Sequence, residues 1–191
     1  MLKKSFLMMF VSMVVLAIAV SAFGEVSLPE KKKTSLGLYV NSKQAYEMWK
    51  ASPEKIAIID TRTPQEYNYV GHATMAYNIP SNFMTMEFDP KKKTYKTEVN
   101  KSFLADVQKR FKKEQTLLIM CRSGSRSAKA ANLLAKAGYK KVYNIYDGFE
   151  GDKVKDTSSY FKGKRMVNGW KNSGNPWSYK GDETLIYTPH K

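Results

Sequence analysis

Residues 117–138 read LLIMCRSGSRSAKAANLLAKAG. The apolar run at 117–120 is typical of a strand that is buried on both faces of a parallel sheet. It leads directly into Cys121, and the alanine-rich segment 127–137 predicts a helix. Gly138 is suited to close that helix, because glycine adopts a left-handed C-terminal cap without strain. The segment therefore predicts a buried strand, a short loop that begins with cysteine, and a helix.

Similar apolar segments recur along the chain and predict further strands and helices. The strands are residues 56–59, 76–79 and 142–145, and the helices are residues 42–50 and 98–111. Alternating strands and helices with apolar strands indicate an α/β domain with a largely parallel central sheet. In such sheets ligands bind beyond the carboxyl ends of the strands. Asp60 and Cys121 each follow a strand, so we expect the site at that edge.

Cys121 is the only cysteine of the chain, so no intramolecular disulfide can stabilise the fold. A lone cysteine is either a buried inert residue or a working nucleophile. Five residues separate it from the predicted helix: Arg122, Ser123, Gly124, Ser125 and Arg126. This loop places backbone N–H groups, two hydroxyls and two positive charges near the sulfur, which favours a reactive thiolate. In the alternative interpretation, Cys121 simply ends a strand and the arginines form surface ion pairs.

The N-terminal segment has the three parts of a secretory signal. Lys3 and Lys4 precede an apolar run at 6–20, and small residues follow at 21–24. We expect cleavage after Ala22 or Gly24 and a periplasmic or otherwise exported protein. The alternative is an uncleaved membrane anchor, because the apolar run is close to the length needed to span a bilayer.

The remaining chain is expected to form one domain of ordinary size. Residues 1–24 form the signal peptide, 25–36 a flexible tether, and 37–191 the domain, with a polar surface insertion at 151–168. An aromatic tail that contains Trp170 and Trp177 is expected to pack back on the core.

The formal net charge is +15, and it becomes +13 when Lys3 and Lys4 leave with the leader. Such a surface attracts small anions or an acidic partner protein. The lysine clusters 31–33 and 91–93 accompany no nucleic-acid recognition motif and are interpreted as solvated loops, so no nucleic-acid partner is expected. Membrane association is expected only if the leader is uncleaved, and the sequence does not indicate an oligomeric state.

Several motifs together resemble the rhodanese-like sulfurtransferases, in the expected order and over residues 37–179. They are Asp60-Thr61-Arg62 with Glu66-Tyr67, Gly71-His72, Asn78-Ile79-Pro80, the loop 121–126, the Asp-Gly turn at 146–151, Gly169-Trp170 and Asn175-Pro176-Trp177.

The resemblance implies a single rhodanese-like domain with a central parallel five-stranded sheet and helices on both faces. Cys121 would accept a sulfane sulfur from thiosulfate or polysulfide as a persulfide and pass it to a thiol, cyanide or a partner protein, with no metal or organic cofactor. The loop residues 122–126 would bind the anionic substrate. Asp60, Arg62, Glu66 and His72 are expected to have supporting roles, with Glu66 paired to Arg62 or Arg126 and His72 in a structural turn.

Two other functions remain open. Cysteine-dependent phosphatases and arsenate reductases use Cys-x5-Arg, which requires arginine at position 127, where this chain has Ser127. The loop is therefore one residue too short for phosphate. The second alternative is a non-catalytic rhodanese module or a sulfur carrier that binds a partner.

Overall fold

The computed structural model describes residues 27–189. Five strands form one parallel sheet in the order β1-β8-β7-β2-β4. Their bounds are β1 Tyr39–Val40, β2 Ile56–Asp60, β4 Ala76–Asn78, β7 Thr116–Met120 and β8 Val142–Ile145. The expected α/β fold with a parallel five-stranded sheet is confirmed, and both β2 and β7 are central strands. Their uninterrupted apolar sequences are explained by burial on both faces.

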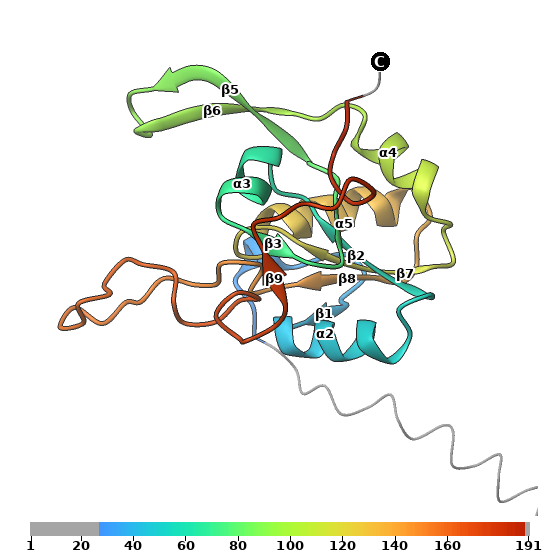
Figure 1. Cartoon of the computed structure of the whole chain (residues 1–191), viewed down its shortest axis with the longest axis horizontal. Helices are drawn as coiled ribbons and strands as arrows, with labels where there is room; N and C mark the ends of the chain where they lie inside the picture. The colour runs from blue at the N-terminus through green and yellow to red at the C-terminus, as the bar shows by residue number, and fades with distance from the viewer. Residues whose placement is uncertain (1–26, 190–191) are drawn as a thin grey trace, which may run out of the picture.

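Helices cover both faces of this sheet (Figure 1). Their bounds are α2 Ser42–Ala51, α3 Pro64–Tyr69, α4 Phe103–Arg110 and α5 Ser125–Lys136. Alternate residues along β7 enter different cores: Leu117 and Ile119 pack with α4 and α5, whereas Leu118 and Met120 pack with residues of α2 and with Trp170. This alternation fixes the sheet between two apolar layers.

The C-terminal segment packs against the core, as expected. Trp170 is fully buried, and its indole Nε1 donates to the carbonyl of Pro176 at 2.9 Å. Strand β9, Trp177–Ser178, pairs antiparallel with β3, His72–Ala73. Tyr179 is an exception, because 56% of its surface remains exposed.

The expectation of a helix over residues 98–111 was wrong at its N-terminal end. Strand β6, Thr94–Val99, pairs antiparallel with β5, Asn82–Asp89, and the two form a projecting hairpin that the sequence did not reveal (Figure 1). The helix begins only after Asn100, whose side-chain oxygen accepts a hydrogen bond from the Ser102 amide at 2.9 Å. Because every residue of β6 is exposed, the strand lacks the half-buried alternation that identifies strands in sequences.

The described part of the expected tether, residues 27–36, packs on the domain and corrects that prediction. It contains the 3-10 helix η2, Glu30–Lys32. Lys32 is buried and pairs with Asp152 at 3.0 Å, while its carbonyl accepts a hydrogen bond from Asn144 at 3.0 Å. These contacts join residues far apart in the sequence, so local composition did not predict them.

The polar segment 151–168 lies on the surface as a long loop beside the sheet (Figure 1). A bridge between Lys153 and Arg165 joins its two sides, and the amide of Asp152 donates to the side-chain oxygen of Asn168 at 2.7 Å near its base. The predicted leader lies outside the described residues. Within residues 27–189, no helix is both long and apolar enough to cross a bilayer.

Candidate functional site

Cys121 lies directly after β7, where the carboxyl ends of the parallel strands meet. Its side chain is buried, with 2% of the residue exposed. Its carbonyl oxygen accepts a hydrogen bond from the amide of Phe149 at 2.8 Å, which fixes the backbone against the loop after β8. The position agrees with the general rule for ligand sites in open α/β sheets.

The loop is held tightly between β7 and α5 by two glycines with positive φ. Gly124 has φ +93°, and a Cβ there would lie 2.1 Å from the carbonyl oxygen of Tyr146. Gly148 has φ +65°, and a Cβ there would lie 2.5 Å from the carbonyl oxygen of Cys121. Only glycine fits at either position without moving backbone. Helix α5 also begins at Ser125, two residues earlier than expected, so the turn is shorter than the sequence indicated.

The sulfur of Cys121 faces two donors at the start of α5. The amide of Gly124 lies 3.2 Å from Sγ, and the hydroxyl of Ser127 lies 3.4 Å from it. The Ser127 hydroxyl is also 2.7 Å from Oδ1 of Asn144, whose amide nitrogen donates to the Gly124 carbonyl. Because a serine hydroxyl has one hydrogen, Ser127 can donate either to Asn144 or to a charged sulfur. Sequence reasoning missed Ser127 and Asn144.

Arg126 forms an ion pair with Glu66 in the first turn of α5. Its two terminal nitrogens lie 2.7 and 2.5 Å from the carboxylate oxygens. Burial alone would raise the pKa of Glu66 and lower the pKa of Arg126, because it disfavours both charged forms. The ion pair outweighs burial, so the pKa of Glu66 is lowered and the pKa of Arg126 is raised. Glu66 also accepts the amide of Thr63 in the capping box of α3. Of the two arginine partners expected for Glu66, the structure therefore selects Arg126.

Arg122 and Arg165 supply positive charge beside the loop, and both act on the half-buried carboxyl of Glu150, whose pKa is raised by burial, a shift that these charges oppose. Arg122 is exposed, and neither arginine forms an ion pair among the residues that the structure describes. Burial, and then the charge of Arg122, lower the pKa of Arg165, which comes from the surface insertion. One guanidinium nitrogen of Arg165 donates to the carbonyl of Gly151 at 2.6 Å. Sequence reasoning missed Arg165, because its segment showed no periodicity.

Asp60 and Arg62 form a fully buried pair that organises the neighbouring loop. Arg62 donates through Nε and Nη2 to Asp60, with the closest approach 2.6 Å, and its amide is capped by the same carboxylate. Nη2 also donates to the carbonyl of Gly71 at 2.8 Å, and the guanidinium lies 4.1 Å from the ring centre of Phe149. The expected structural roles of both residues fit these contacts.

His72 lies in a structural position. Its ring stacks on Tyr67 at 3.9 Å between centroids, and Nδ1 lies 3.1 Å from the Tyr67 carbonyl. These contacts anchor His72 within strand β3, where it pairs with Ser178 of β9, so the structure places it in a strand and not in the turn expected from the sequence.

Two grooves flank the cysteine loop. One of about 540 Å³ lies between the loop and the hairpin, and it is lined by Arg122, Arg126 and residues of β5 and β6. The other, of about 740 Å³, lies between Ser123, the N-terminal segment and the base of the insertion. Ser125, the remaining predicted loop residue, begins α5 and is half-buried. The loop is therefore accessible from two sides, although the sulfur itself is nearly covered.

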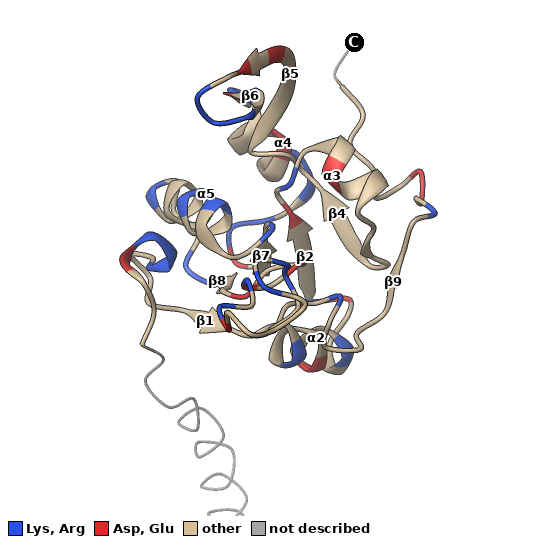
Figure 2. Cartoon of the chain, turned by 90° about the vertical axis from the view of Figure 1, so that its left-hand side faces the viewer, with Lys and Arg blue, Asp and Glu red and all other residues tan. Residues whose placement is uncertain are grey.

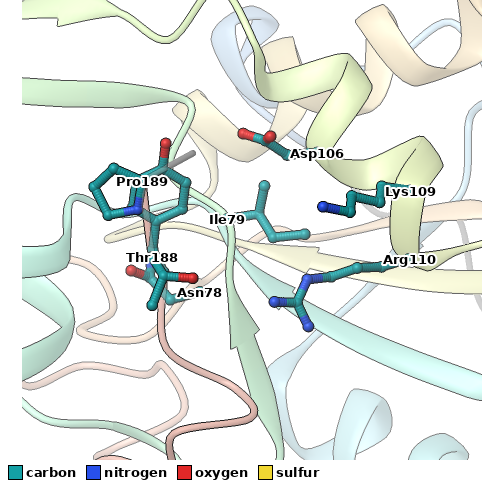
Figure 3. Close-up of a pocket in the computed structure, with 8 residues that line it drawn as sticks. Asn78, Ile79, Asp106, Lys109, Arg110, Thr188 and Pro189 are labelled. Atoms are coloured by element: carbon teal, nitrogen blue, oxygen red, sulfur yellow. The ribbon is translucent and has the colours of Figure 1, made fainter. Parts of the chain in front are cut away.

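A further cavity of about 440 Å³ lies at the β4 side of the sheet (Figure 3). Lys109 and Arg110 of α4 line it opposite the tail residues Thr188 and Pro189. None of residues 121–127 lines it, so it is separate from the cysteine site. Among residues 27–189, no group of three or more His, Cys, Asp or Glu side chains is arranged to hold a metal ion.

Comparisons with known proteins agree with this geometry. The sequence model of the Rhodanese-like domain matches residues 42–155. An uncharacterized protein of Rickettsia prowazekii (strain Madrid E) is 30% identical over 122 residues, which are 64% of this chain and 82% of that protein. Thiosulfate sulfurtransferase 16, chloroplastic, of Arabidopsis thaliana is 34% identical over 91 residues, which are 48% of this chain and 68% of that protein. The crystal structure of Rv0390 from M. tuberculosis superposes with a TM-score of 0.57 and 28% identity, covering 74% of this chain and 96% of that one.

Proposed function

Because the chain belongs to the rhodanese-like domain family, we propose that it is a sulfurtransferase in which Cys121 carries the transferred sulfur. The donor would be thiosulfate or polysulfide, and the acceptor a thiol, cyanide or a partner protein. The observation that carries the proposal is the position of the only cysteine, with its sulfur 3.2 Å from the Gly124 amide at the start of α5. A helix N-terminus stabilises a thiolate and any anion that replaces it.

The reaction has two displacement steps. The Cys121 thiolate attacks the outer sulfur of thiosulfate, the sulfur–sulfur bond of the donor breaks, and sulfite leaves with the bonding electrons. Cys121 is then a persulfide anion, whose charge lies near the same donors that faced the thiolate. In the second step an acceptor nucleophile attacks the terminal sulfur, and Cys121 leaves as a thiolate. No external oxidant or reductant is consumed, because the sulfane sulfur moves at an unchanged oxidation level.

The residues around the sulfur support both steps in different ways. The Gly124 amide and the Ser127 hydroxyl are neutral donors in contact with it. Such preorganised donors stabilise the negative charge on the thiolate and on the persulfide. Arg122 is exposed at the rim, where its charge can attract an anionic donor. Arg126 acts mainly as a positioning residue, because its guanidinium is held by Glu66.

Mass spectrometry of the intact protein tests the proposal. After incubation with thiosulfate or polysulfide, the protein should gain about 32 Da, the mass of one sulfur atom, and cyanide or a thiol should remove it. The Cys121→Ser variant should show no gain with either donor. Release of phosphate from an aryl phosphate that depends on Cys121, without any sulfur gain, would instead favour the phosphatase alternative.

A further inference from the structure

The groove beside Ser123 is strongly basic. Its charged lining comprises Lys31, Lys32, Lys153, Lys155 and Arg165, against the single carboxylate of Asp152. That carboxylate is already paired with Lys32 at 3.0 Å. Figure 2 shows Lys and Arg on η2 and on the loops near the sheet, viewed from the side toward which the insertion and the hairpin project.

The exposed lysines of this groove have no ion-pair partner within residues 27–189. Lys31, Lys153 and Lys155 are exposed, and none of them forms an ion pair within the described part of the chain. Arg165 is half-buried; burial and then the charge of Arg122 lower its pKa, and the carboxylates of Glu150 and Asp152 oppose that shift. Positive charges gathered in a concave surface create a positive electrostatic potential, which attracts an anionic ligand.

The groove is built mainly from parts of the chain that the family match does not include. That match covers residues 42–155. The N-terminal segment 27–32 forms one wall, and Arg165 and Val167 contribute to the opposite side, so both lie outside the match. Among its positive charges, Lys31, Lys32 and Arg165 lie outside the match, whereas Lys153 and Lys155 lie at its C-terminal end. A feature of this kind is suited to a ligand particular to this chain.

The size and surroundings of the groove indicate a segment of a protein. A volume of about 740 Å³ greatly exceeds what cyanide or thiosulfate needs. The same insertion also exposes apolar side chains: Tyr160 is 85% exposed, Val167 60%, Met166 47% and Phe161 42%. Aromatic residues and methionine are enriched in protein interfaces. A small anion would leave these side chains in water, whereas a protein partner could cover them.

We propose that this groove binds an acidic segment of a partner protein, and that a cysteine of this segment accepts the sulfur from Cys121. The inference rests on the proposed sulfurtransferase function for its chemical step. Ser123, which lines the groove, is two residues from Cys121, so the groove lies beside the cysteine loop. The partner's thiol releases its proton to water, and the resulting thiolate attacks the terminal sulfur of the persulfide. The sulfur–sulfur bond breaks, Cys121 leaves as a thiolate, and the partner becomes the persulfide.

Binding is measured first, without any sulfur chemistry. Two fluorescent peptides of equal length are compared, one rich in Asp and Glu and one in which Asn and Gln replace them, each with Ser in place of its single Cys. The acidic peptide should bind the full chain at least about tenfold more tightly at low salt, and this preference should decrease as salt is added.

Charge reversal locates the binding. The double variant Lys153→Glu/Lys155→Glu should reduce the preference for the acidic peptide to less than about twofold. The matched control, Lys140→Glu/Lys141→Glu, makes the same change of net charge immediately before β8, at the opposite end of the parallel strands. Both control lysines are exposed and do not line the groove, so the control should retain the preference.

Transfer is measured next, with the cysteine-containing peptides and with protein loaded to equal persulfide content as measured by mass. Faster transfer to the acidic peptide, lost in the Lys153/Lys155 variant alone, supports the inference. Equal effects of the two double variants, or equal binding of the two peptides, overturn the docking site. The same preference for a small carboxylate-bearing thiol over a small neutral thiol would assign the groove to a small anion and also overturn it. Acidic binding without any persulfide on Cys121 would overturn the proposed function and the acceptor role but leave the docking site standing.

Discussion

Replacing Glu66 with Gln tests how firmly the first turn of α5 is fixed. The substitution keeps the shape and the acceptor for the Thr63 amide, but removes the charge that pairs with Arg126. The carboxylate and guanidinium side chains are 16% and 28% exposed and share two hydrogen bonds of 2.5 and 2.7 Å. Exposed pairs contribute about 0–1 kcal/mol, whereas breaking a fully buried pair costs about 3–5 kcal/mol. For this intermediate burial we expect a loss of about 2 kcal/mol.

This loss should be visible in thermal unfolding at pH 7. For a chain of this size, about 2 kcal/mol corresponds to a decrease in Tm of about 4–8 °C. Glu87→Gln is the matched control, because Glu87 pairs with Lys96 while its side chain is 67% exposed. We expect that variant to stay within about 0.5 kcal/mol of the wild type. Equal stability of both variants and the wild type would show that the Glu66–Arg126 pair does not fix α5.

The same pair gives a defined dependence on pH. The pKa of Glu66 is lowered in the folded state, although burial alone would raise it. Its contribution to stability is therefore fully present above the pKa of the unfolded chain, about 4.3, and is lost as the pH falls through the folded pKa. The difference in unfolding free energy between the wild type and Glu66→Gln should shrink below about pH 4. A difference that is constant from pH 7 to pH 3 would contradict the assignment to this charge.

Three further variants test the loop and its support. Gly124→Ala should lower the free energy of unfolding, measured with denaturant, by more than about 2 kcal/mol, because its Cβ would lie 2.1 Å from a backbone oxygen. Gly138→Ala is the control: its Cβ would have no contact closer than 3.5 Å, so it should lower the same free energy by only about 1 kcal/mol. Ser127→Ala should slow alkylation of Cys121 by iodoacetamide about fivefold, which corresponds to one hydrogen bond of about 1 kcal/mol, and an unchanged rate would exclude the hydroxyl as a donor to the sulfur. Asp60→Asn should cost about 3 kcal/mol in the same unfolding assay, since it leaves a fully buried guanidinium without its counter-charge.

The central strands and the position of Cys121 could be predicted because their physical signals are local. A strand buried on both faces needs a continuous apolar sequence, and the segment 117–120 has one. Gly138, predicted to close α5, has the positive φ of +97° that this role requires. The sequence signals of these elements lie within a few residues of one another, so they can be recognised without knowledge of the fold.

The parts that sequence reasoning missed depend on contacts between distant residues. Lys32 can be buried because it forms an ion pair with Asp152, which lies 120 residues further along the chain. Strand β6 is exposed along its length, so its pairing with β5 left no apolar alternation. Arg165 lies near the cysteine loop because the insertion folds back, and its guanidinium donates to the carbonyl of Gly151. No local pattern of residue types reports such pairings, and the structure was needed to find them.

The charges around Cys121 divide into two groups with separate tasks. The guanidiniums of Arg62 and Arg126 pair with Asp60 and Glu66, and these pairs fix the loop after β2 and the first turn of α5. Arg122 at the rim is exposed and can attract an anion, while the two groups that donate hydrogen bonds to the sulfur, the Gly124 amide and the Ser127 hydroxyl, are neutral. Rim charges in water are screened by salt, whereas hydrogen bonds within a buried site are screened much less. Salt should therefore slow the encounter with an anionic donor and reduce kcat/KM, yet leave the rate of persulfide formation at saturating donor nearly unchanged.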